Sequence, residues 1–377
     1  MKVKIVIRQF VKMAVQNFLL PLLYRAFRLQ SVQKGLVVFA DAHHFTAPAS
    51  MELLVKEVKR RGNRKVIELY DDYQQISFLR LLRRMVVFMA YYAKAQYVVI
   101  CDNFLPVASC KKRKGTTVIQ LWHGCGAFKK FGYDTTGDIP SYYKGNVFQN
   151  CDIVTVSAPA CVPYFQTAMR LPADVFRPFG VCRTDKFFKK KYNEACKKLF
   201  AKRYPDALGK KIVLWAPTFR GSPADPKLAQ YEDIQWLSDQ LGESAFVIVK
   251  VHPLLTKKYP YDNCALSTDQ LLPVADLMIT DYSSIFFEYC IYKKPVIFYA
   301  PDVEEYGMQR GFYLDYNSLP GVAAKDKYAL EKEVRRALTQ GQKDCEKAQA
   351  FYEKYMCGCD GHALKRMADF ICTDQQA

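Results

Sequence analysis

Short apolar runs with β-branched centres alternate along the chain with longer amphipathic stretches, a pattern typical of parallel strands joined by helices. In the first half of the chain this pattern predicts strands within 35–42, 65–72, 95–103, 116–124 and 151–159. Helices are predicted at 51–62 and over the arginine-bearing stretch 78–94. The alternation predicts an α/β domain built on a parallel sheet.

The same alternation starts again after a lysine-rich helical stretch that ends near residue 203. Strands are predicted within 210–221, 244–255, 275–284 and 295–302, and a helix is predicted near the C-terminus. At 377 residues the chain is long enough for two domains. We therefore predict two Rossmann-like, doubly wound domains, 31–190 and 191–377, that face each other across a cleft.

Residues 1–30 combine lysines and arginines with large apolar side chains. This mixture is typical of a basic amphipathic helix lying on an anionic membrane surface, and Pro21 is expected to break or kink that helix. The stretch 78–94 shows the same mixture around Arg80, Arg83 and Arg84. For both segments the alternative is a basic helix packed on the protein's own core. No window is apolar over enough residues to predict a transmembrane helix.

The charge is concentrated in the first part of the chain. Residues 1–150 hold 24 Lys/Arg and 9 Asp/Glu, a net charge of +15, whereas the whole chain carries +18. A basic half indicates an anionic partner, which is nucleic acid, anionic lipid or a phosphorylated substrate. A solvated basic face is the alternative. No nucleic-acid-binding signature is present, so charge is the only feature that favours nucleic acid as the partner.

The thirteen cysteines are scattered through apolar runs, and no secretory signal precedes them. We interpret them as reduced and cytosolic. Cys357 and Cys359 have no second pair at ligand spacing, and the adjacent His43 and His44 match no metal motif. No cofactor is therefore predicted, and Mg²⁺ is left open as an ion carried by donor phosphates.

Polar residues recur at the ends of predicted strands, where open parallel sheets bind their ligands. His123, Thr218, His252 and Asp281 each follow such a strand. In "TDYSSIFFE" the helix that begins near residue 285 offers free N–H groups to an anion, and the serine hydroxyls add donors. The alternative is a plain helix cap. Beside Arg220, a bidentate donor, phosphate binding is favoured.

The stretch "LWHGCGAFKKFGYD", residues 121–134, leaves His123 with three interpretations. It is a catalytic base, a metal or redox partner of Cys125, or a histidine buried beside Trp122. Gly124 and Gly126 are expected to let the backbone approach a substrate closely. The two lysines that follow contact either the acceptor's phosphates or only water.

Five segments together resemble the motif series of the CDP-glycerol glycerophosphotransferases of teichoic acid synthesis. They are "LWHGCGAFKKFGYD", "FGVCRTDKFF", "LWAPTFRG", "KVHPLL" and the block "ADLMITDYSSIFFEYCIYKKPVIFYAPDVEEYGMQRGFYLDY". Order and approximate spacing agree over roughly residues 85–370. The chain departs from common family patterns at Cys125-Gly126, at Cys182 and at Lys250-Val251, which leaves the chemical groups in place.

The resemblance implies a GT-B fold, peripheral association with the cytoplasmic membrane face, and transfer of glycerol phosphate from CDP-glycerol. The acceptor is a hydroxyl on an undecaprenyl-pyrophosphate-linked molecule, and CMP is released. By the same resemblance His123 is the base, His252 lies near the donor pyrophosphate and Glu288 lies near the ribose. The candidate substrate-binding residues are Lys129, Lys130, Arg183, Thr218, Arg220, Asp281, Ser283, Ser284 and Glu288.

Chain length favours a primase-type enzyme over a polymerase, and a ribitol-phosphate transferase is equally open on motif grounds. Two rivals remain. A GT-B glycosyltransferase would share the phosphate site but release a nucleoside diphosphate. A non-catalytic basic membrane or nucleic-acid binder would function without His123.

Overall fold

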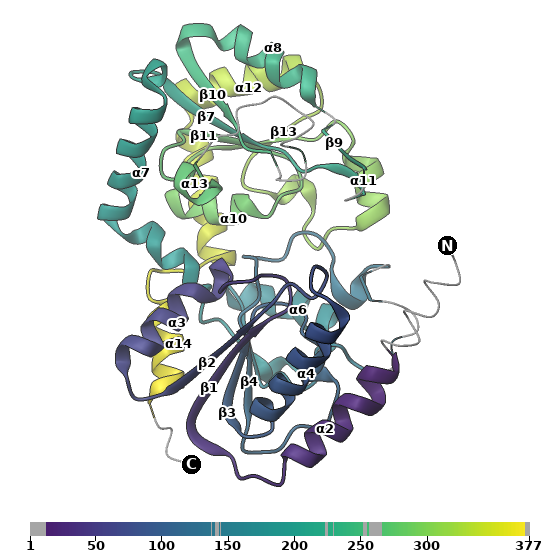
Figure 1. The fold of residues 1–377 in the computed structure, drawn as a ribbon. Helices are drawn as coiled ribbons and strands as arrows, with labels where there is room; N and C mark the ends of the chain where they lie inside the picture. Colours follow the sequence, from purple (N-terminus) through teal and green to yellow (C-terminus); the bar gives the residue numbers. More distant parts are fainter. Residues whose placement is uncertain are drawn as a thin grey trace. The chain divides into compact units, whose positions relative to one another are not determined.

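The computed structural model describes residues 13–136, 138–139, 143, 145–222, 225–228, 230–251, 255 and 266–373. The chain divides into two compact units, each with its own parallel sheet (Figure 1). The first unit comprises Met1–Gly124, Phe131–Asp185 and Gly358–Ala377, and the second comprises Cys125–Lys130 and Lys186–Cys357. The α/β class with parallel sheets, predicted from the alternation of apolar runs, is confirmed.

The first sheet runs in the order β2-β1-β3-β4-β5-β6, and every pair in it is parallel. Its strands are β1 (Gln33–Asp41), β2 (Lys65–Tyr70), β3 (Ala95–Ile100), β4 (Thr117–Gln120), β5 (Ile153–Thr155) and β6 (Phe176–Arg177). The order reverses between β1 and β3, so the switch point of the sheet lies where these two strands end. β6 has only two residues and no apolar run, and the sequence pattern does not predict it.

Helices cover this sheet because their apolar stripes need a partner. They are α3 (Ala49–Arg61), α4 (Phe78–Tyr92), α5 (Leu105–Ala108), α6 (Val162–Met169) and α14 (Ala363–Cys372). α3 ends as expected for a helix dipole, with three cations in its last turn and Gly62 in the left-handed conformation. Met51 and Leu54 of α3 share a core with Val37 and Val99 of the sheet.

The C-terminal helix belongs to the first unit, which corrects the predicted domain 191–377. Met367 and Ile371 of α14 are fully buried in the same core as Met51 and Leu54 of α3. Figure 1 shows α14 beside α3. Apolar periodicity predicts this helix but does not say which sheet it covers. The segment Cys125–Lys130 was predicted within the first domain, 31–190, but belongs to the second unit.

At the N-terminus the helix passes through Pro21 instead of ending there. A π-helical turn (Val15–Leu19) leads directly into α2 (Leu20–Phe27). Because proline cannot donate the usual hydrogen bond and its ring crowds the preceding turn, a wider turn accommodates it. Tyr24 of α2 is buried against Tyr92 of α4, with ring centroids 5.1 Å apart.

The second sheet repeats the same reversal, in the order β10-β7-β11-β12-β13, again all parallel. Its strands are β7 (Lys211–Ala216), β10 (Ala245–Val249), β11 (Leu277–Thr280), β12 (Val296–Tyr299) and β13 (Val322–Ala324). A separate antiparallel ribbon is formed by β8 (Arg220–Ser222) and β9 (Asp225–Lys227). The switch point lies where β7 and β11 end.

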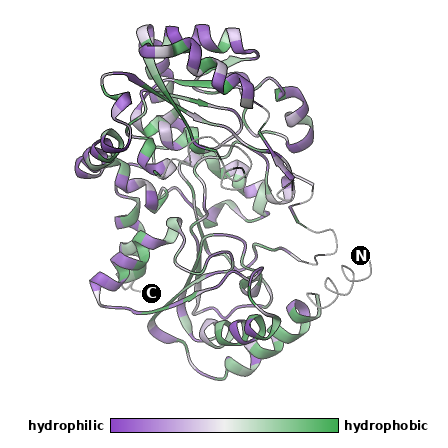
Figure 2. Ribbon diagram, turned by 45° about the horizontal axis from the view of Figure 1, so that its top comes forward, coloured by the Kyte–Doolittle hydropathy of each residue, from purple (hydrophilic) through white to green (hydrophobic). Residues whose placement is uncertain are grey.

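Alternate residues of β12 face opposite sides of this sheet. Ile297 and Tyr299 join the core beneath α8 (Tyr231–Leu241) and α12 (Lys327–Gln340). Phe298 instead packs edge-on against Phe286 of α10 (Ile285–Tyr289), which contacts Phe351 of α13 (Gln342–Tyr355). Figure 2 shows hydrophobic and hydrophilic residues alternating along the helices of this unit.

The remaining helices of the second unit are α7 (Lys190–Arg203), α9 (Thr268–Leu271) and α11 (Val303–Arg310). Short 3-10 turns occur at Gly132–Asp134, Pro159–Cys161, Ala173–Val175, Cys182–Phe188, Pro205–Ala207, Gly242–Ser244, Cys290–Tyr292 and Tyr316–Ser318. No helix in the described part of the chain is both long enough and apolar enough to cross a membrane.

Candidate functional site

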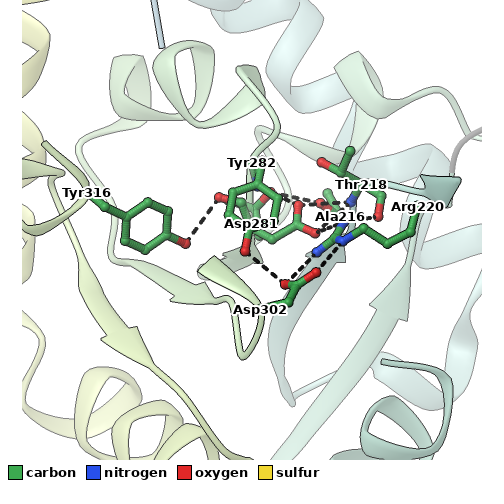
Figure 3. Close-up of polar contacts among 8 residues, drawn as sticks. Ala216, Thr218, Arg220, Asp281, Tyr282, Asp302 and Tyr316 are labelled. Atoms are coloured by element: carbon green, nitrogen blue, oxygen red, sulfur yellow. Dashed lines mark hydrogen bonds and ion pairs between the residues drawn. The ribbon is translucent and has the colours of Figure 1, made fainter. Parts of the chain in front are cut away.

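Residues predicted to bind substrate meet at the switch point of the second sheet. Thr218 follows β7 and Asp281 follows β11. The Thr218 backbone N–H donates to both carboxylate oxygens of Asp281, over 2.9 and 3.1 Å. Nη1 of Arg220 donates to Oδ2 of the same carboxylate over 3.0 Å (Figure 3). The structure therefore brings Thr218, Arg220 and Asp281 together.

Asp302, which sequence analysis missed, completes this cluster. Nε and Nη2 of Arg220 donate to its two oxygens over 2.6 and 3.0 Å, as a bidentate pair (Figure 3). Asp302 comes shortly after β12, so it occupies the same kind of strand-end position as Asp281. That position, in "IFYAPD", is the signal that would have identified it.

Arg220 is enclosed by these carboxylates, with its side chain only 16% exposed. Burial opposes the charge of both partners, yet the ion pair raises the pKa of Arg220 and lowers the pKa of Asp302 relative to their ordinary values. The expected role of Arg220, to grip donor phosphates, conflicts with this arrangement because most of its donors already serve Asp281 and Asp302. In this structure Arg220 fixes the positions of the two carboxylates.

Tyrosines surround the ion pair. The fully buried Tyr282 donates from its hydroxyl to Asp302 over 2.8 Å, and the Tyr316 hydroxyl donates to the backbone oxygen of Asp281 over 3.3 Å (Figure 3). The Tyr282 ring stacks on Tyr306 at 3.9 Å, and the Arg220 guanidinium lies 4.7 Å from the Tyr282 ring centroid. These contacts give the cluster one fixed geometry.

The predicted anion site at α10 is only partly formed by its hydroxyls. Ser283 Oγ accepts from the Ile285 N–H over 3.4 Å, whereas Ser284 occupies the N-cap position without a side-chain capping bond. Both serines are half-buried. Glu288 is 2% exposed, so a ribose could reach it only if neighbouring side chains moved.

One hydroxyl in the cluster lacks a partner. Oγ1 of Thr218 is buried and forms no hydrogen bond with any described residue. An unmade hydrogen bond in a buried position costs free energy, so such an atom indicates a place for a ligand or a water molecule.

The two predicted lysines lie on the second unit, although His123 does not. Lys129 forms an isolated antiparallel bridge with Phe312, and the Lys130 N–H donates to the Gly311 oxygen over 3.1 Å. Phe128 stacks on Phe312, with ring centroids 4.9 Å apart. Backbone contacts thus hold the segment Cys125–Lys130 on the second unit.

This placement puts Lys129 in the electrostatic field of the strand-end cluster. Burial lowers the pKa of its ammonium, which the Asp281 carboxylate opposes and Arg310 and Arg220 reinforce. Lys129 makes no ion pair with a carboxylate of the described residues. Its charge therefore remains available to a ligand, which distinguishes it from Arg220.

Gly124 and Gly126, the two glycines near His123, differ in the space around them. Gly126 has φ +64°, and a Cβ atom there would lie 2.1 Å from the Phe287 ring. The close approach that Gly126 permits is therefore to Phe287 rather than to a substrate. Gly124 has open space around its missing side chain.

His123 follows β4, at the carboxyl edge of the first sheet and one strand beyond the switch point. Its side chain is 55% exposed and its ring lies 4.5 Å from that of Trp122, so it is not a buried core histidine. Nδ1 lies 3.3 Å from Oδ2 of Asp102, a second residue that sequence analysis missed. Nη2 of Arg183 donates to the His123 backbone oxygen over 3.3 Å, so Arg183 contacts the loop rather than the ring.

Asp102 follows β3 and carries the charge that orients His123. Burial alone would raise the pKa of Asp102, but the hydrogen bond and charge of His123, together with the Asn103 backbone N–H and the charge of His43, outweigh it and the pKa is lowered. With Nδ1 facing the carboxylate, Nε2 of His123 is the nitrogen available as a base. Cys125 is a buried cysteine of the second unit and forms no disulfide with any described residue.

The prediction for His252 and the question of a metal site concern residues outside these two clusters. His252, the other proposed histidine, lies outside the described residues. Among the residues that the structure describes, no group of three or more His, Cys, Asp or Glu side chains could hold a metal ion.

Comparison with known proteins connects these sites to a family. Residues 22–373 match the family described as CDP-glycerol:poly(glycerophosphate) glycerophosphotransferase. The chain is 32% identical over 363 residues to the teichoic acid ribitol-phosphate primase of Bacillus spizizenii, covering 92% of each protein. It is 32% identical over 293 residues to the teichoic acid glycerol-phosphate primase of Bacillus subtilis, covering 73% of each.

Solved structures agree on the fold. The wall teichoic acid polymerase TagF superimposes with a TM-score of 0.74 at 21% identity, over 98% of each chain. A UDP-N-acetylglucosamine 2-epimerase of Listeria monocytogenes superimposes with a TM-score of 0.56 at 13% identity, over 90% of this chain and 96% of that one. At these identities the likeness concerns the fold alone.

Proposed function

The chain belongs to the CDP-glycerol:poly(glycerophosphate) glycerophosphotransferase family, and from that membership we propose that it transfers glycerol phosphate from CDP-glycerol to a hydroxyl of a lipid-linked acceptor, releasing CMP. The acceptor is an undecaprenyl-pyrophosphate disaccharide of wall teichoic acid synthesis. The observation that carries the proposal is that the family match, residues 22–373, includes both strand-end clusters. Members of this family are transferases.

Donor binding is assigned to the second unit. The unpartnered Thr218 hydroxyl and the half-buried Ser283 and Ser284 offer hydrogen-bond donors to phosphate oxygens. Lys129 adds a positive charge that forms no ion pair with a carboxylate of the described residues. Arg220 and Asp302 hold this surface in place and act as positioning residues.

The chemical step needs a base and a leaving group. In the proposed reaction Nε2 of His123 takes the proton of the attacking hydroxyl, and the hydroxyl oxygen bonds to the glycerol-bearing phosphorus. The bond from that phosphorus to the bridging oxygen breaks, and its electron pair leaves with CMP. The partner of His123, Asp102, stabilises the imidazolium while the proton is held.

A primase that adds one unit is favoured because the chain is 32% identical to the ribitol-phosphate primase and 29% identical to the poly(ribitol-phosphate) polymerase. The chain covers 92% of the ribitol-phosphate primase but only 58% of the poly(ribitol-phosphate) polymerase of the same organism. CDP-ribitol is the second candidate donor, because that ribitol-phosphate primase matches over a longer stretch than the glycerol-phosphate primase does.

We place the protein at the cytoplasmic face of the membrane, as a peripheral protein. Phe18, Leu22 and Leu29 near α2 are 75%, 65% and 92% exposed. On the neighbouring α4, Phe78 and Leu79 are also exposed beside arginines. Large apolar side chains interleaved with cations are what an anionic bilayer surface binds.

Product analysis tests the proposal. The purified protein is incubated with CDP-glycerol, CDP-ribitol or a nucleoside-diphosphate sugar, each with a lipid-linked disaccharide acceptor. CMP and an acceptor longer by one polyol phosphate are expected from a CDP-polyol. Release of a nucleoside diphosphate with sugar transfer would overturn the proposal, and a ladder of products would replace the primase with a polymerase.

A further inference from the structure

Asp102 and His123 form a pair across two loops, and one buried amide joins those loops. Gln120 ends β4 and is 0% exposed, and it lies opposite Ile100, which ends β3. Because β3 and β4 are parallel neighbours, the loops that follow them begin at the same edge of the sheet. A side chain at the end of β4 can therefore contact both loops.

Both functional groups of the Gln120 side chain are engaged, one in each loop. Nε2 donates to the backbone oxygen of Asp102 over 2.9 Å, and Oε1 accepts from the backbone N–H of Trp122 over 3.0 Å. A buried amide is costly unless its groups are paired, and an apolar side chain of similar size would fill the same space without hydrogen bonds. The amide thus forms a cross-link between the two loops.

Trp122, at one end of this cross-link, has an unusual backbone conformation. Its φ of +58° lies in the left-handed region, which is unfavourable for a residue with a large side chain. Such a conformation persists only where its surroundings fix it. The ring packs against Phe131 and Phe165, with centroids 5.0 and 6.0 Å away. Gln120 and these rings together therefore hold Trp122 in this conformation.

The conformation of Trp122 determines where the next residue, His123, lies. The two rings are 4.5 Å apart, and Nδ1 of His123 is 3.3 Å from Oδ2 of Asp102. Asp102 is held at its backbone oxygen by Gln120. At 3.3 Å the pair is near the limit of a hydrogen bond, so a shift of either loop by about 1 Å would separate it.

A second Asp–His pair at the carboxyl edge of this sheet needs no such cross-link. Asp41 ends β1, and its Oδ2 lies 2.9 Å from Nδ1 of His44, three residues further along the same loop. The same oxygen accepts from the His43 backbone N–H over 2.8 Å. Local backbone geometry therefore forms that pair, whereas Asp102 and His123 lie on different loops and depend on a contact between them.

We propose that Gln120 is a positioning residue of the transfer reaction, which ties the loop of His123 to the loop of Asp102 and so aims Nε2 of His123 at the acceptor hydroxyl. This inference rests on the proposed function. Gln120 is buried and takes no part in bond making or breaking. Its effect on the reaction passes through the orientation of His123.

Two matched variants test the inference. Gln120→Met keeps the length and approximate volume of the side chain and removes both hydrogen bonds. Thr116→Val is the control: Thr116 precedes β4, is buried, and donates from its hydroxyl to the Ala95 oxygen at the start of β3 over 2.8 Å. The control therefore removes a buried hydrogen bond between the same two strands, at the opposite edge of the sheet from His123.

The kinetic test measures CMP release with CDP-glycerol and the lipid-linked disaccharide acceptor. In Gln120→Met, kcat should fall about 10–100-fold, because a catalytic group displaced by about 1 Å loses activity of that order. The KM for CDP-glycerol should stay unchanged. Thr116→Val should keep the wild-type kcat, although both variants should melt at a lower temperature than wild type.

Two further variants separate positioning from general stability. Gln120→Glu keeps an acceptor for the Trp122 N–H, so it should retain more of the wild-type kcat than Gln120→Met does, even though a buried carboxyl lowers its melting temperature. In an Asp102→Asn background, Gln120→Met should lower kcat much less than it does in wild type, since both changes disturb the orientation of one ring.

Crystal structures of Gln120→Met and Thr116→Val give a readout that does not depend on turnover. In Gln120→Met, Trp122 should leave the left-handed region and the distance from Nδ1 of His123 to Oδ2 of Asp102 should increase. In Thr116→Val both should remain as in wild type.

The contrary outcomes are distinct. A wild-type kcat in Gln120→Met, an equal fall of kcat in Thr116→Val, or an unchanged Trp122 conformation in Gln120→Met overturns the inference and leaves the proposed function intact. Effects of Gln120→Met and Asp102→Asn that multiply in full also overturn it, because the two residues would then act independently. Failure of wild-type protein to release CMP from either CDP-polyol rejects the proposed function, and the crystal structures then still decide whether Gln120 holds the two loops.

Discussion

At the end of the second sheet, Arg220 is enclosed by Asp281 and Asp302 with 16% of its side chain exposed, whereas at the end of the first sheet His44 and His123 are more than half exposed. Both clusters occupy the switch point of a sheet with the same strand reversal. In the cluster of the second sheet, the arginine and the two carboxylates pair with each other. In the cluster of the first sheet, each carboxylate orients a histidine ring whose Nε2 is left without a carboxylate partner among the described residues. A closed network suits a donor surface of fixed geometry, and open rings suit proton transfer.

The largest effect is expected in the exposed histidine cluster of the first sheet. His123→Ala removes the proposed base, so kcat for transfer should fall by about 10²–10⁴-fold, the usual contribution of general base catalysis. The KM for CDP-glycerol should stay unchanged because the donor is assigned to the other unit. Release of CMP is the measurement. Turnover within threefold of wild type, with the fold intact, would remove His123 from the mechanism.

On the closed side, Arg220→Leu should destabilise the protein by about 3–5 kcal/mol, because two carboxylates lose their cation in a buried setting. Denaturant unfolding measures the loss. Arg335→Leu is the matched control: Arg335 is 47% exposed and pairs with Glu331 on the surface of α12, so its loss should cost about 0.5 kcal/mol. Equal effects of the two substitutions would show that the closed network has no special stability.

The same ion pair predicts a pH dependence of stability. Since the pKa of Asp302 is lowered in the folded protein, its contribution is fully present above the unfolded value of about 4. Stability should fall as the pH drops through the lowered pKa. In Asp302→Asn that part of the acid dependence should be missing, and an unchanged acid profile would contradict the assignment.

The comparison also shows what the sequence could and could not predict. Strand-end positions in the apolar pattern located Thr218, Asp281 and His123, because parallel strands deliver their last residues to one edge. The pattern does not say which residues pair across that edge. Asp302 and Asp102 were missed for this reason, although both follow predicted strands, and so was the pairing of Arg220 with two carboxylates.

Apolar periodicity also did not predict two short strands, and it did not predict to which unit two other segments belong. β6 and β13 are two and three residues long and leave no apolar run to recognise. α14 reads as an ordinary amphipathic helix, and only tertiary packing places it beside α3. The six residues Cys125–Lys130 follow the first unit's His123 in the chain but bond to the second unit's Gly311 and Phe312.

That segment joins the two clusters in sequence, and Gly126 tests how firmly it is seated. Gly126→Ala should destabilise the protein by about 2 kcal/mol, because the added methyl meets Phe287 and the backbone has φ +64°. Gly124→Ala is the control, since it meets nothing within 4 Å and should change stability by less than about 0.5 kcal/mol. Thermal melting separates the two. Equal melting temperatures would mean that the segment is not held against Phe287.

The smallest expected effect concerns Lys129, the cation beside the Arg220 cluster that is proposed to bind the donor. Lys129→Gln should raise the KM for CDP-glycerol about 10-fold, the loss of one charge-assisted contact with a phosphate oxygen, and should leave acceptor KM unchanged. Lys130→Gln is the matched control, because the Lys130 alkyl chain lies against Gly311. Isothermal titration with CDP-glycerol gives the affinity without turnover. If both lysine variants bind the donor as wild type does, the second cluster supplies no free cation, and the contrast between a donor surface and an open acceptor edge loses its electrostatic basis.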